Sequence, residues 1–192
     1  MNARTIFLLS PANLGGKRGA MLLEPRSKLA LARSLSSESG APLGELYGFV
    51  SSLYFRGKIA YARAFGAACV MTPGGGLCSP EAPITRERLE GWQRVSVSEH
   101  NPHFTAPLVR HATELLDASD DAARFVLLGS VASNKYVVPL LEVFDSRLLY
   151  PARFAGLGDM ARGALMLQAA RDGAELDYEP VRAARRRAHA PG

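Results

Sequence analysis

Four short apolar runs in this chain each end in a polar or glycine-rich turn, and stretches long enough for helices separate them. The runs are Thr5–Leu9, Ala67–Met71, Arg124–Leu128 and Arg147–Leu149. A nearly continuous apolar run is typical of a strand that is buried on both faces, as in a parallel sheet. The alternation therefore predicts a three-layer α/β domain with a mostly parallel sheet of about four to five strands flanked by helices. Because parallel strands end at the same edge of a sheet, we expect a ligand site there.

Three other segments refine this prediction. The longest helical stretch is 43–65, and Gly48 and Gly57 weaken it, so we expect it to break near Gly57. The segment 176–181 is expected to add a last strand at a sheet edge, and 95–98 alternates in the manner of a short exposed edge strand.

Length and charge indicate one domain with a basic end. We expect residues 1–181 to form a single domain and residues 182–192 to be a basic tail without ordered structure, because this tail holds no apolar side chain larger than alanine. Of the net charge of +5, four positive charges belong to Arg182, Arg185, Arg186 and Arg187, which leaves about +1 for the rest of the chain. These four arginines are the candidate contacts to a nucleic-acid backbone.

The cysteines and the apolar runs exclude several classes of protein. Cys69 and Cys78 form no Cys-x-x-Cys pair, and no histidine cluster accompanies them. We therefore expect reduced thiols in a cytoplasmic protein, with no metal site and no cofactor. The chain opens on a strand rather than on a targeting segment, and no apolar run reaches the roughly 18 residues of a membrane helix, so no membrane association is expected.

The turn after the first run carries the features of an anion site. Backbone N–H groups at a helix start attract anions, and nearby cations add to that attraction. The candidate contacts in this turn are Ser10, Asn13, Gly16, Lys17 and Arg18. The alternative is a tight turn with solvated cations. It is not a Walker A loop, because Pro11 stands where the first glycine belongs and Arg18 replaces the Ser/Thr.

The turns after the second and third runs add further candidates. Three consecutive glycines after Thr72 indicate either the close approach of a flat ligand or phosphate, or a turn that needs positive φ; the candidates are Thr72, Gly74, Gly75 and Gly76. The third turn offers Gly129, Ser130, Lys135 and Tyr136. No glycine follows Ser130 at the second position, so this turn is not a nucleophile elbow.

The remaining candidates lie on predicted helices. Asp159 follows Gly156-x-Gly158 and precedes Arg162 by three residues, so it is the best candidate for a general base or, alternatively, a helix-start acid paired with Arg162. Glu45 is a second carboxylate candidate. Tyrosines repeat along 43–65 together with Lys58. We expect Tyr47 and Tyr54 either to stack on a base, with Lys58 near a phosphate, or to pack half-buried on the sheet.

The order of these pieces resembles a known family. The resemblance rests on Gly-Glu-Leu-Tyr and Ser-x-Leu-Tyr-Phe within 44–62, on Gly76-Leu77 with Pro80, on Lys135-Tyr136-x-x-Pro139 within 127–141, and on Pro151 with Gly156-x-Gly158. This order of motifs is similar to that of uncharacterised bacterial and phage domains of the uracil-DNA-glycosylase-like type, as attached to enzymes that handle deazaguanine in nucleic acid. The resemblance covers about residues 5–170 and implies a base or nucleotide pocket at the strand ends.

This chain departs from true uracil-DNA glycosylases. It lacks their Gly-x-Asp-Pro-Tyr loop, since Ser10-Pro11-Ala12-Asn13 stands there, and it lacks a His-Pro-Ser loop. The resemblance therefore does not support glycosylase activity.

Together these features predict recognition or processing of a nucleobase, nucleotide or nucleic-acid segment at the carboxyl ends of the strands. One alternative is a small-molecule hydrolase or transferase that acts on a phosphorylated metabolite with Asp159 as the base. The other is a non-catalytic protein that binds a partner in nucleic-acid metabolism. The sequence leaves open whether the protein is an enzyme.

Overall fold

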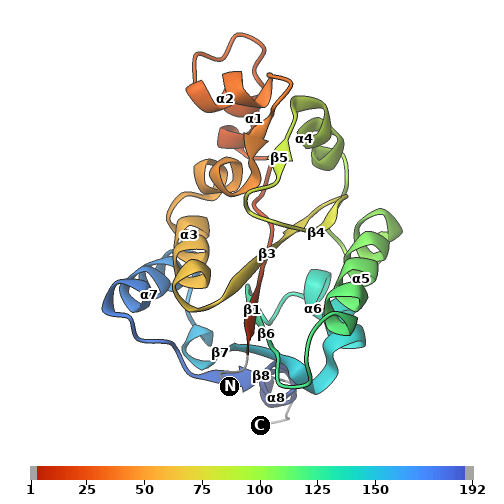
Figure 1. The fold of residues 1–192 in the computed structure, drawn as a ribbon, viewed down its shortest axis with the longest axis vertical. Helices are drawn as coiled ribbons and strands as arrows, with labels where there is room; N and C mark the ends of the chain where they lie inside the picture. Colours follow the sequence, from red (N-terminus) through yellow and green to blue (C-terminus); the bar gives the residue numbers. More distant parts are fainter. Residues whose placement is uncertain (1–3, 189–192) are drawn as a thin grey trace.

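A computed structural model describes residues 4–188 of the chain, with side chains up to residue 184. A six-stranded sheet lies between two layers of helices (Figure 1). Its strands are β1 (Thr5–Leu9), β3 (Ala67–Thr72), β4 (Gly76–Cys78), β6 (Arg124–Leu128), β7 (Leu148–Pro151) and β8 (Tyr178–Pro180). The strand order is β4-β3-β1-β6-β7-β8, and the four inner strands are parallel while β4 and β8 are antiparallel to their neighbours. The predicted fold class is confirmed, with slightly more strands than expected.

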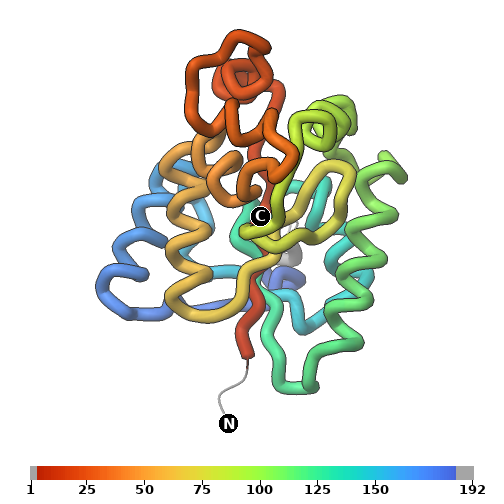
Figure 2. Tube along the Cα trace, turned by 45° about the horizontal axis from the view of Figure 1, so that its top comes forward, coloured from red at the N-terminus to blue at the C-terminus, as the bar shows by residue number. Residues whose placement is uncertain are grey.

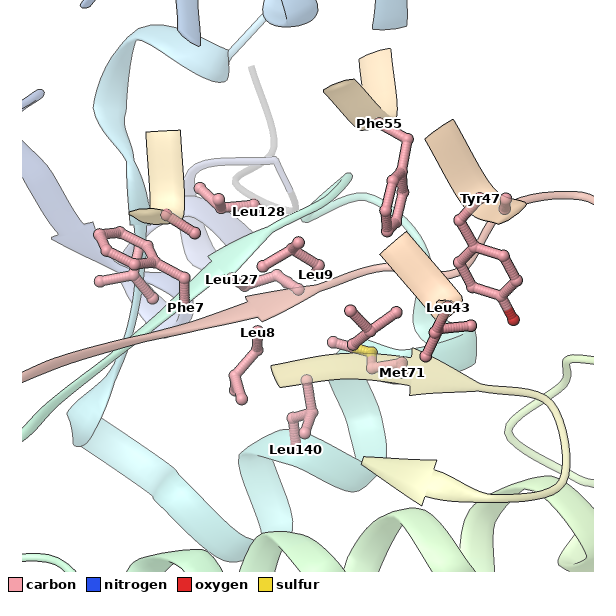
Figure 3. Close-up of a cluster of buried hydrophobic side chains, with 14 of the residues drawn as sticks. Phe7, Leu8, Leu9, Leu43, Tyr47, Phe55, Met71, Leu127, Leu128 and Leu140 are labelled. Atoms are coloured by element: carbon pink, nitrogen blue, oxygen red, sulfur yellow. The ribbon is translucent and has the colours of Figure 1, made fainter. Parts of the chain in front are cut away.

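Helices cover both faces of the sheet because its strands are apolar on both faces. On one side lie α3 (Leu43–Phe65) and α7 (Asp159–Asp172), and on the other lie α5 (Pro102–Asp117) and α6 (Asn134–Phe144) (Figure 1). Figure 3 shows Leu8 pointing toward Leu140 of α6, whereas Leu9 points to the opposite side, toward Phe55 of α3. All five residues of β1 are buried, so this strand forms the centre of the core.

The long helix α3 has the predicted bounds but breaks at a different place. Ser52 has φ 49° and ψ −126°, which is not helical, so the expected break near Gly57 was wrong. Gly57 instead lies against α7, where a Cβ atom on Gly57 would come 2.6 Å from the carbonyl oxygen of Gly163. The absent side chains let the two helices pack closely, which brings their side chains together near the strand ends.

A cap of short elements extends beyond the carboxyl ends of the strands (Figures 1 and 2). It consists of α1 (Lys17–Leu23), α2 (Ala30–Leu35), α4 (Arg86–Gln93) and a two-stranded ribbon of β2 (Ala41–Pro42) and β5 (Pro83–Ile84). The segment 95–98, expected to be an edge strand, is irregular. It follows α4 into the cap, where the backbone has no neighbouring strand with which to pair.

The chain order places a topological switch point at the middle of the sheet. From β1 the chain crosses to β3 on one side, and it later returns to β6 on the other side of β1. The segments that follow β1 and β6 therefore lead to helices on opposite faces of the sheet, and ligands of open α/β sheets bind in the crevice at such a point.

The basic end of the chain lies at the opposite end of the sheet. Pro180 of β8 pairs with Leu149, near the start of β7, and helix α8 (Val181–Ala188) follows. Val181 is buried, and Arg182 Nη2 lies 2.7 Å from Asp145 Oδ1 in the 3-10 turn η1 (Asp145–Arg147), which precedes β7. The expectation of an unstructured tail was therefore wrong up to residue 188, because burial of Val181 and this ion pair dock the segment. The side chains of Arg185, Arg186 and Arg187 and residues 189–192 lie outside the described part of the structure.

Within the described part of the chain, no helix is both long and apolar enough to cross a lipid bilayer.

Candidate functional site

A cavity of about 490 Å³ lies at the carboxyl edge of the sheet, beside the switch point. Its walls come from the loop after β1, the turn after β3, the end of α4 and the start of α6. The lining residues are Pro11–Gly15, Pro73, Trp92, Gln93, Val95–Val97, Ser133, Lys135 and Tyr136. Its volume falls within the range of small-ligand pockets. The exits of β1, β3 and β6 thus converge on one cavity.

The triglycine turn is explained by a side chain of the protein itself. A Cβ atom on Gly74 would lie 3.1 Å from Cδ1 of Trp92, and one on Gly75 would lie 2.8 Å from Cζ2 of the same ring. Gly76 has φ 64°, which L side chains rarely adopt. Thr72 Oγ1 closes the turn by accepting a hydrogen bond from the Gly75 N–H at 3.0 Å and donating one to the Gly76 carbonyl at 3.1 Å. The flat group that needs the glycines is therefore the Trp92 indole.

The first part of the loop after β1 lines the cavity, whereas Lys17 and Arg18, which follow it, lie elsewhere. Asn13 Oδ1 accepts a hydrogen bond from the Gly15 N–H at 3.0 Å, and Gln93 Nε2 donates one to the Leu14 carbonyl at 3.2 Å, so the cap holds the part of the loop that lines the cavity. Lys17 is exposed and lines a separate depression of about 550 Å³ beside α2. Arg18 donates from Nη1 to the Phe49 carbonyl at 3.2 Å. Neither Lys17 nor Arg18 lines the cavity.

A buried lysine lies beside the cavity and binds the residue that follows β1. Lys58 of α3 is 1% exposed, and its Nζ donates to Ser10 Oγ at 2.7 Å and to the Ser10 carbonyl at 3.1 Å. Ser10 Oγ in turn donates to the Leu128 carbonyl at 3.4 Å, so this network joins the ends of β1 and β6. Burial lowers the pKa of Lys58 to about 7, Asp159 opposes this shift and Arg162 adds to it. A lysine with that pKa exists in both protonation states near neutral pH.

Helix α7 brings Asp159 and Arg162 to the same region. Arg162 Nη1 lies 3.6 Å from Asp159 Oδ1, and Arg162 Nε donates to the Phe154 carbonyl at 3.3 Å. Tyr54 lies between these charges and the lysine, since its ring centroid is 3.9 Å from Lys58 Nζ. Burial raises the pKa of Tyr54 to about 12, and Asp159 adds to this shift while Arg162 opposes it. We call Ser10, Tyr54, Lys58, Asp159 and Arg162 the charged cluster.

The charged cluster and the cavity are neighbours. Tyr136 lines the cavity, and its Oη accepts a hydrogen bond from the Ser130 N–H at 3.4 Å. Tyr136 is also one of the groups whose charge acts on Tyr54. Gly129 lies at the same place, where a Cβ atom would come 3.0 Å from Ser10 Cβ. The absence of a side chain at Gly129 therefore lets the β1 and β6 exits approach each other.

Other predicted residues lie elsewhere. Tyr47 is fully buried and packs edge-on against Phe55, and burial raises its pKa above the usual range. Glu45 is exposed and lines a larger, mostly apolar groove of about 950 Å³ between α2 and α3. The segment after the antiparallel edge strand β4 lines that groove, but no exit of a parallel strand of the main sheet does, so we take the smaller cavity as the candidate site. Asp159 is 68% exposed on its side chain, which is an unfavourable environment for a carboxylate general base.

Sequence reasoning missed the contribution of the cap. Trp92 and the segment 95–97 line the cavity but follow no strand, so the search of strand exits could not find them. The available signal was the triglycine turn, whose missing side chains require a flat partner, together with the single tryptophan of the chain.

Among residues 4–188, no group of three or more His, Cys, Asp or Glu side chains gathers in a way that could hold a metal ion. Comparisons with protein-family models, with curated proteins and with solved structures find no match to this chain.

Proposed function

We propose that the protein recognises a nucleobase, free or within a nucleotide or nucleic acid, in the cavity at the carboxyl edge of the sheet. The observation that carries this proposal is the composition of the cavity walls. Flat or rigid surfaces from Trp92, Tyr136, Pro11 and Pro73 stand beside polar groups from Asn13, Ser96, Ser133 and Lys135. A planar heterocycle with polar edges is the ligand that such walls suit, because rings stack on aromatic faces and edges take hydrogen bonds.

The position of the cavity supports the same conclusion. It lies at a switch point of an open parallel sheet, where nucleotides commonly bind, and the resemblance to uracil-DNA-glycosylase-like domains implies a base pocket at the strand ends. The proposal concerns recognition, since the exposed Asp159 gives no particular support to general-base chemistry.

Calorimetric titration with the five common nucleosides tests the proposal. We expect at least one nucleoside to bind, and we expect Tyr136→Ala to weaken it by about 1–3 kcal/mol, or roughly 5- to 150-fold, the scale of one base–aromatic stack. Lys135→Ala should also weaken binding. Lys28→Ala is the matched control, because Lys28 is an exposed lysine that lines the separate depression near α2.

Two results would contradict the proposal. If no nucleoside, nucleotide or oligonucleotide binds, the cavity is not a base site. If binding occurs but Tyr136→Ala and Lys28→Ala have the same small effect, the ligand lies elsewhere on the protein.

A further inference from the structure

The charged cluster contains a buried hydroxyl that the protein leaves without a partner. Tyr54 is 7% exposed, and within the described part of the chain its Oη has no hydrogen-bond partner. A buried polar group in this state lowers the stability of the fold. The ring of Tyr54 belongs to the core, but Asp159, Arg162 and Tyr136 all act on its hydroxyl, so a ligand atom that reached this hydroxyl would meet a donor beside an arginine.

The charges around this hydroxyl favour an anion. Arg162 is 12% exposed on its side chain and Lys58 is fully buried, whereas the one carboxylate, Asp159, is 68% exposed and screened by solvent. The inner part of the cluster thus holds one permanent cation, Arg162, and the Lys58 amine, which is partly protonated near neutral pH. An arginine matches phosphate oxygens with its planar set of donors, and a tyrosine hydroxyl adds one more donor.

Tyr136 connects this cluster to the cavity. Its side chain lines the cavity, its hydroxyl is bound to the Ser130 backbone, and Tyr54 lies within its electrostatic reach. A ligand whose base occupies the cavity therefore has the charged cluster as its next neighbour along the sheet edge.

We propose that the ligand is a phosphate-bearing nucleoside, whose phosphate is held by Tyr54 Oη and Arg162 with Lys58 behind them, while its base occupies the cavity. This inference rests on the proposed function and names the ligand class. The phosphate belongs either to a free nucleotide or to a nucleic-acid strand, because both present the same oxygens to these donors.

The test compares each nucleoside with its 5′-monophosphate and with a short single-stranded oligonucleotide of the same base, together with inorganic phosphate, by calorimetry. We expect the phosphate to tighten binding at least tenfold. Tyr54→Phe and Arg162→Gln should each remove most of this gain and leave nucleoside affinity nearly unchanged. A gain with the mononucleotide assigns a free nucleotide, and a gain only with the oligonucleotide assigns a strand.

Two control variants match these substitutions. Tyr47→Phe removes another buried hydroxyl that has no partner among the described residues and lies outside the charged cluster, and Arg171→Gln removes an exposed arginine on the same helix as Arg162. Both should bind as the unaltered protein does. Tyr54→Phe should unfold at the same or a higher temperature, because it removes an unsatisfied group, so a loss of binding would not reflect misfolding.

The outcomes separate the two proposals. Equal affinity for the nucleoside, its monophosphate and the oligonucleotide overturns the inference but leaves base recognition in the cavity. A phosphate gain that survives both Tyr54→Phe and Arg162→Gln also overturns it, because the phosphate would then bind elsewhere. If neither nucleosides nor phosphorylated ligands bind, both proposals fail.

Discussion

Lys58 Nζ lies 2.7 Å from Ser10 Oγ, so a side chain of helix α3 holds the residue that follows the central strand β1. Its second hydrogen bond, to the Ser10 carbonyl, satisfies a backbone group that no longer belongs to the sheet ladder. The amine therefore fixes the point from which the loop after β1 enters the cavity wall. Stability and the shape of the site depend on the same contact.

Lys58 should make the stability of the protein depend on pH. Its pKa is about 7 in the folded protein and 10.5 when unfolded, so between these values the unfolded chain binds more protons and folding stability rises with pH. The Lys58→Met variant should not show this rise of folding stability with pH. We expect the stability of the unaltered protein minus that of Lys58→Met to increase from pH 7 to 9.5, with a slope approaching about 1.4 kcal/mol per pH unit. Urea denaturation at several pH values measures it, and parallel curves would show that Lys58 titrates normally.

The triglycine turn should tolerate no side chain at its centre. Gly75→Ala would place Cβ 2.8 Å from the rigid Trp92 ring and 2.7 Å from Thr72 Oγ1, so we expect a loss of about 1–3 kcal/mol. Gly91→Ala is the control, because no described atom lies within 4 Å of the added Cβ in helix α4. It should be neutral or stabilise by up to about 1 kcal/mol. Equal effects in chemical denaturation would show that Trp92 does not pack on the turn.

The break in α3 predicts opposite effects at two adjacent serines. Ser52→Gly should stabilise the protein by roughly 1 kcal/mol, since glycine adopts φ 49° without the strain that a side chain causes there. Ser51→Gly should destabilise by about 0.5–1 kcal/mol, because Ser51 lies in the helical part. Thermal unfolding of both variants distinguishes them. A loss at both positions would mean that α3 continues through Ser52 without a break.

The contact between α3 and α7 should also be sensitive to an added side chain. Gly57→Ala would push Cβ to 2.6 Å from the Gly163 carbonyl oxygen, a backbone atom that cannot yield without separating the helices. We expect a loss of at least 2 kcal/mol and weaker ligand binding, since Lys58 and Arg162 would move apart. Gly48→Ala meets only the Arg56 side chain at 3.6 Å and should be neutral or stabilising. Similar denaturation midpoints for the two variants would contradict the close packing.

The arginines of the tail should act on nucleic acid separately from the cavity. Each arginine that neutralises a phosphate adds about 0.7–0.9 to the slope of log affinity against log salt, so changing all four to Gln should flatten the slope by up to roughly 3. Because α8 lies at the opposite end of the sheet, mononucleotide binding should not change. Titrating one labelled oligonucleotide at several salt concentrations tests this. Equal slopes for the two proteins would remove the tail from the interface.

Local patterns in the sequence were enough to predict five strands of the main sheet, but not β4, whose first residue was assigned to the glycine turn. The runs at β1 and β6 are apolar on both faces, and this property depends only on neighbouring residues. Two cap helices also have bounds with a local cause: α1 ends before Pro25, because the residue before a proline disfavours helix, and α4 begins after Thr85, whose Oγ1 accepts a hydrogen bond from the Arg88 N–H. The convergence of β1, β3 and β6 on one edge followed because parallel strands share their direction.

The remaining features depend on contacts between distant residues. Tyr47, Tyr54 and Tyr61 repeat at helical spacing, but the break at Ser52 rotates the first away from the others, and only Tyr54 reaches the charged cluster. Tyr61 instead lies 2.7 Å from the hydroxyl of Tyr178 in β8. Trp92 reaches the cavity through the cap, and Val181 docks α8 on the sheet; neither contact leaves a local pattern.

Trp92 also makes the cavity observable by intrinsic fluorescence. It is the single tryptophan of the chain, and it both packs on the triglycine turn and lines the cavity. Selective excitation of the indole therefore produces fluorescence from this one place. A heterocycle stacked on the indole would quench this fluorescence. A ligand bound to the larger groove or to α8 would have no direct contact with the indole. The protein thus carries an intrinsic fluorophore that reports occupancy of this cavity without a label.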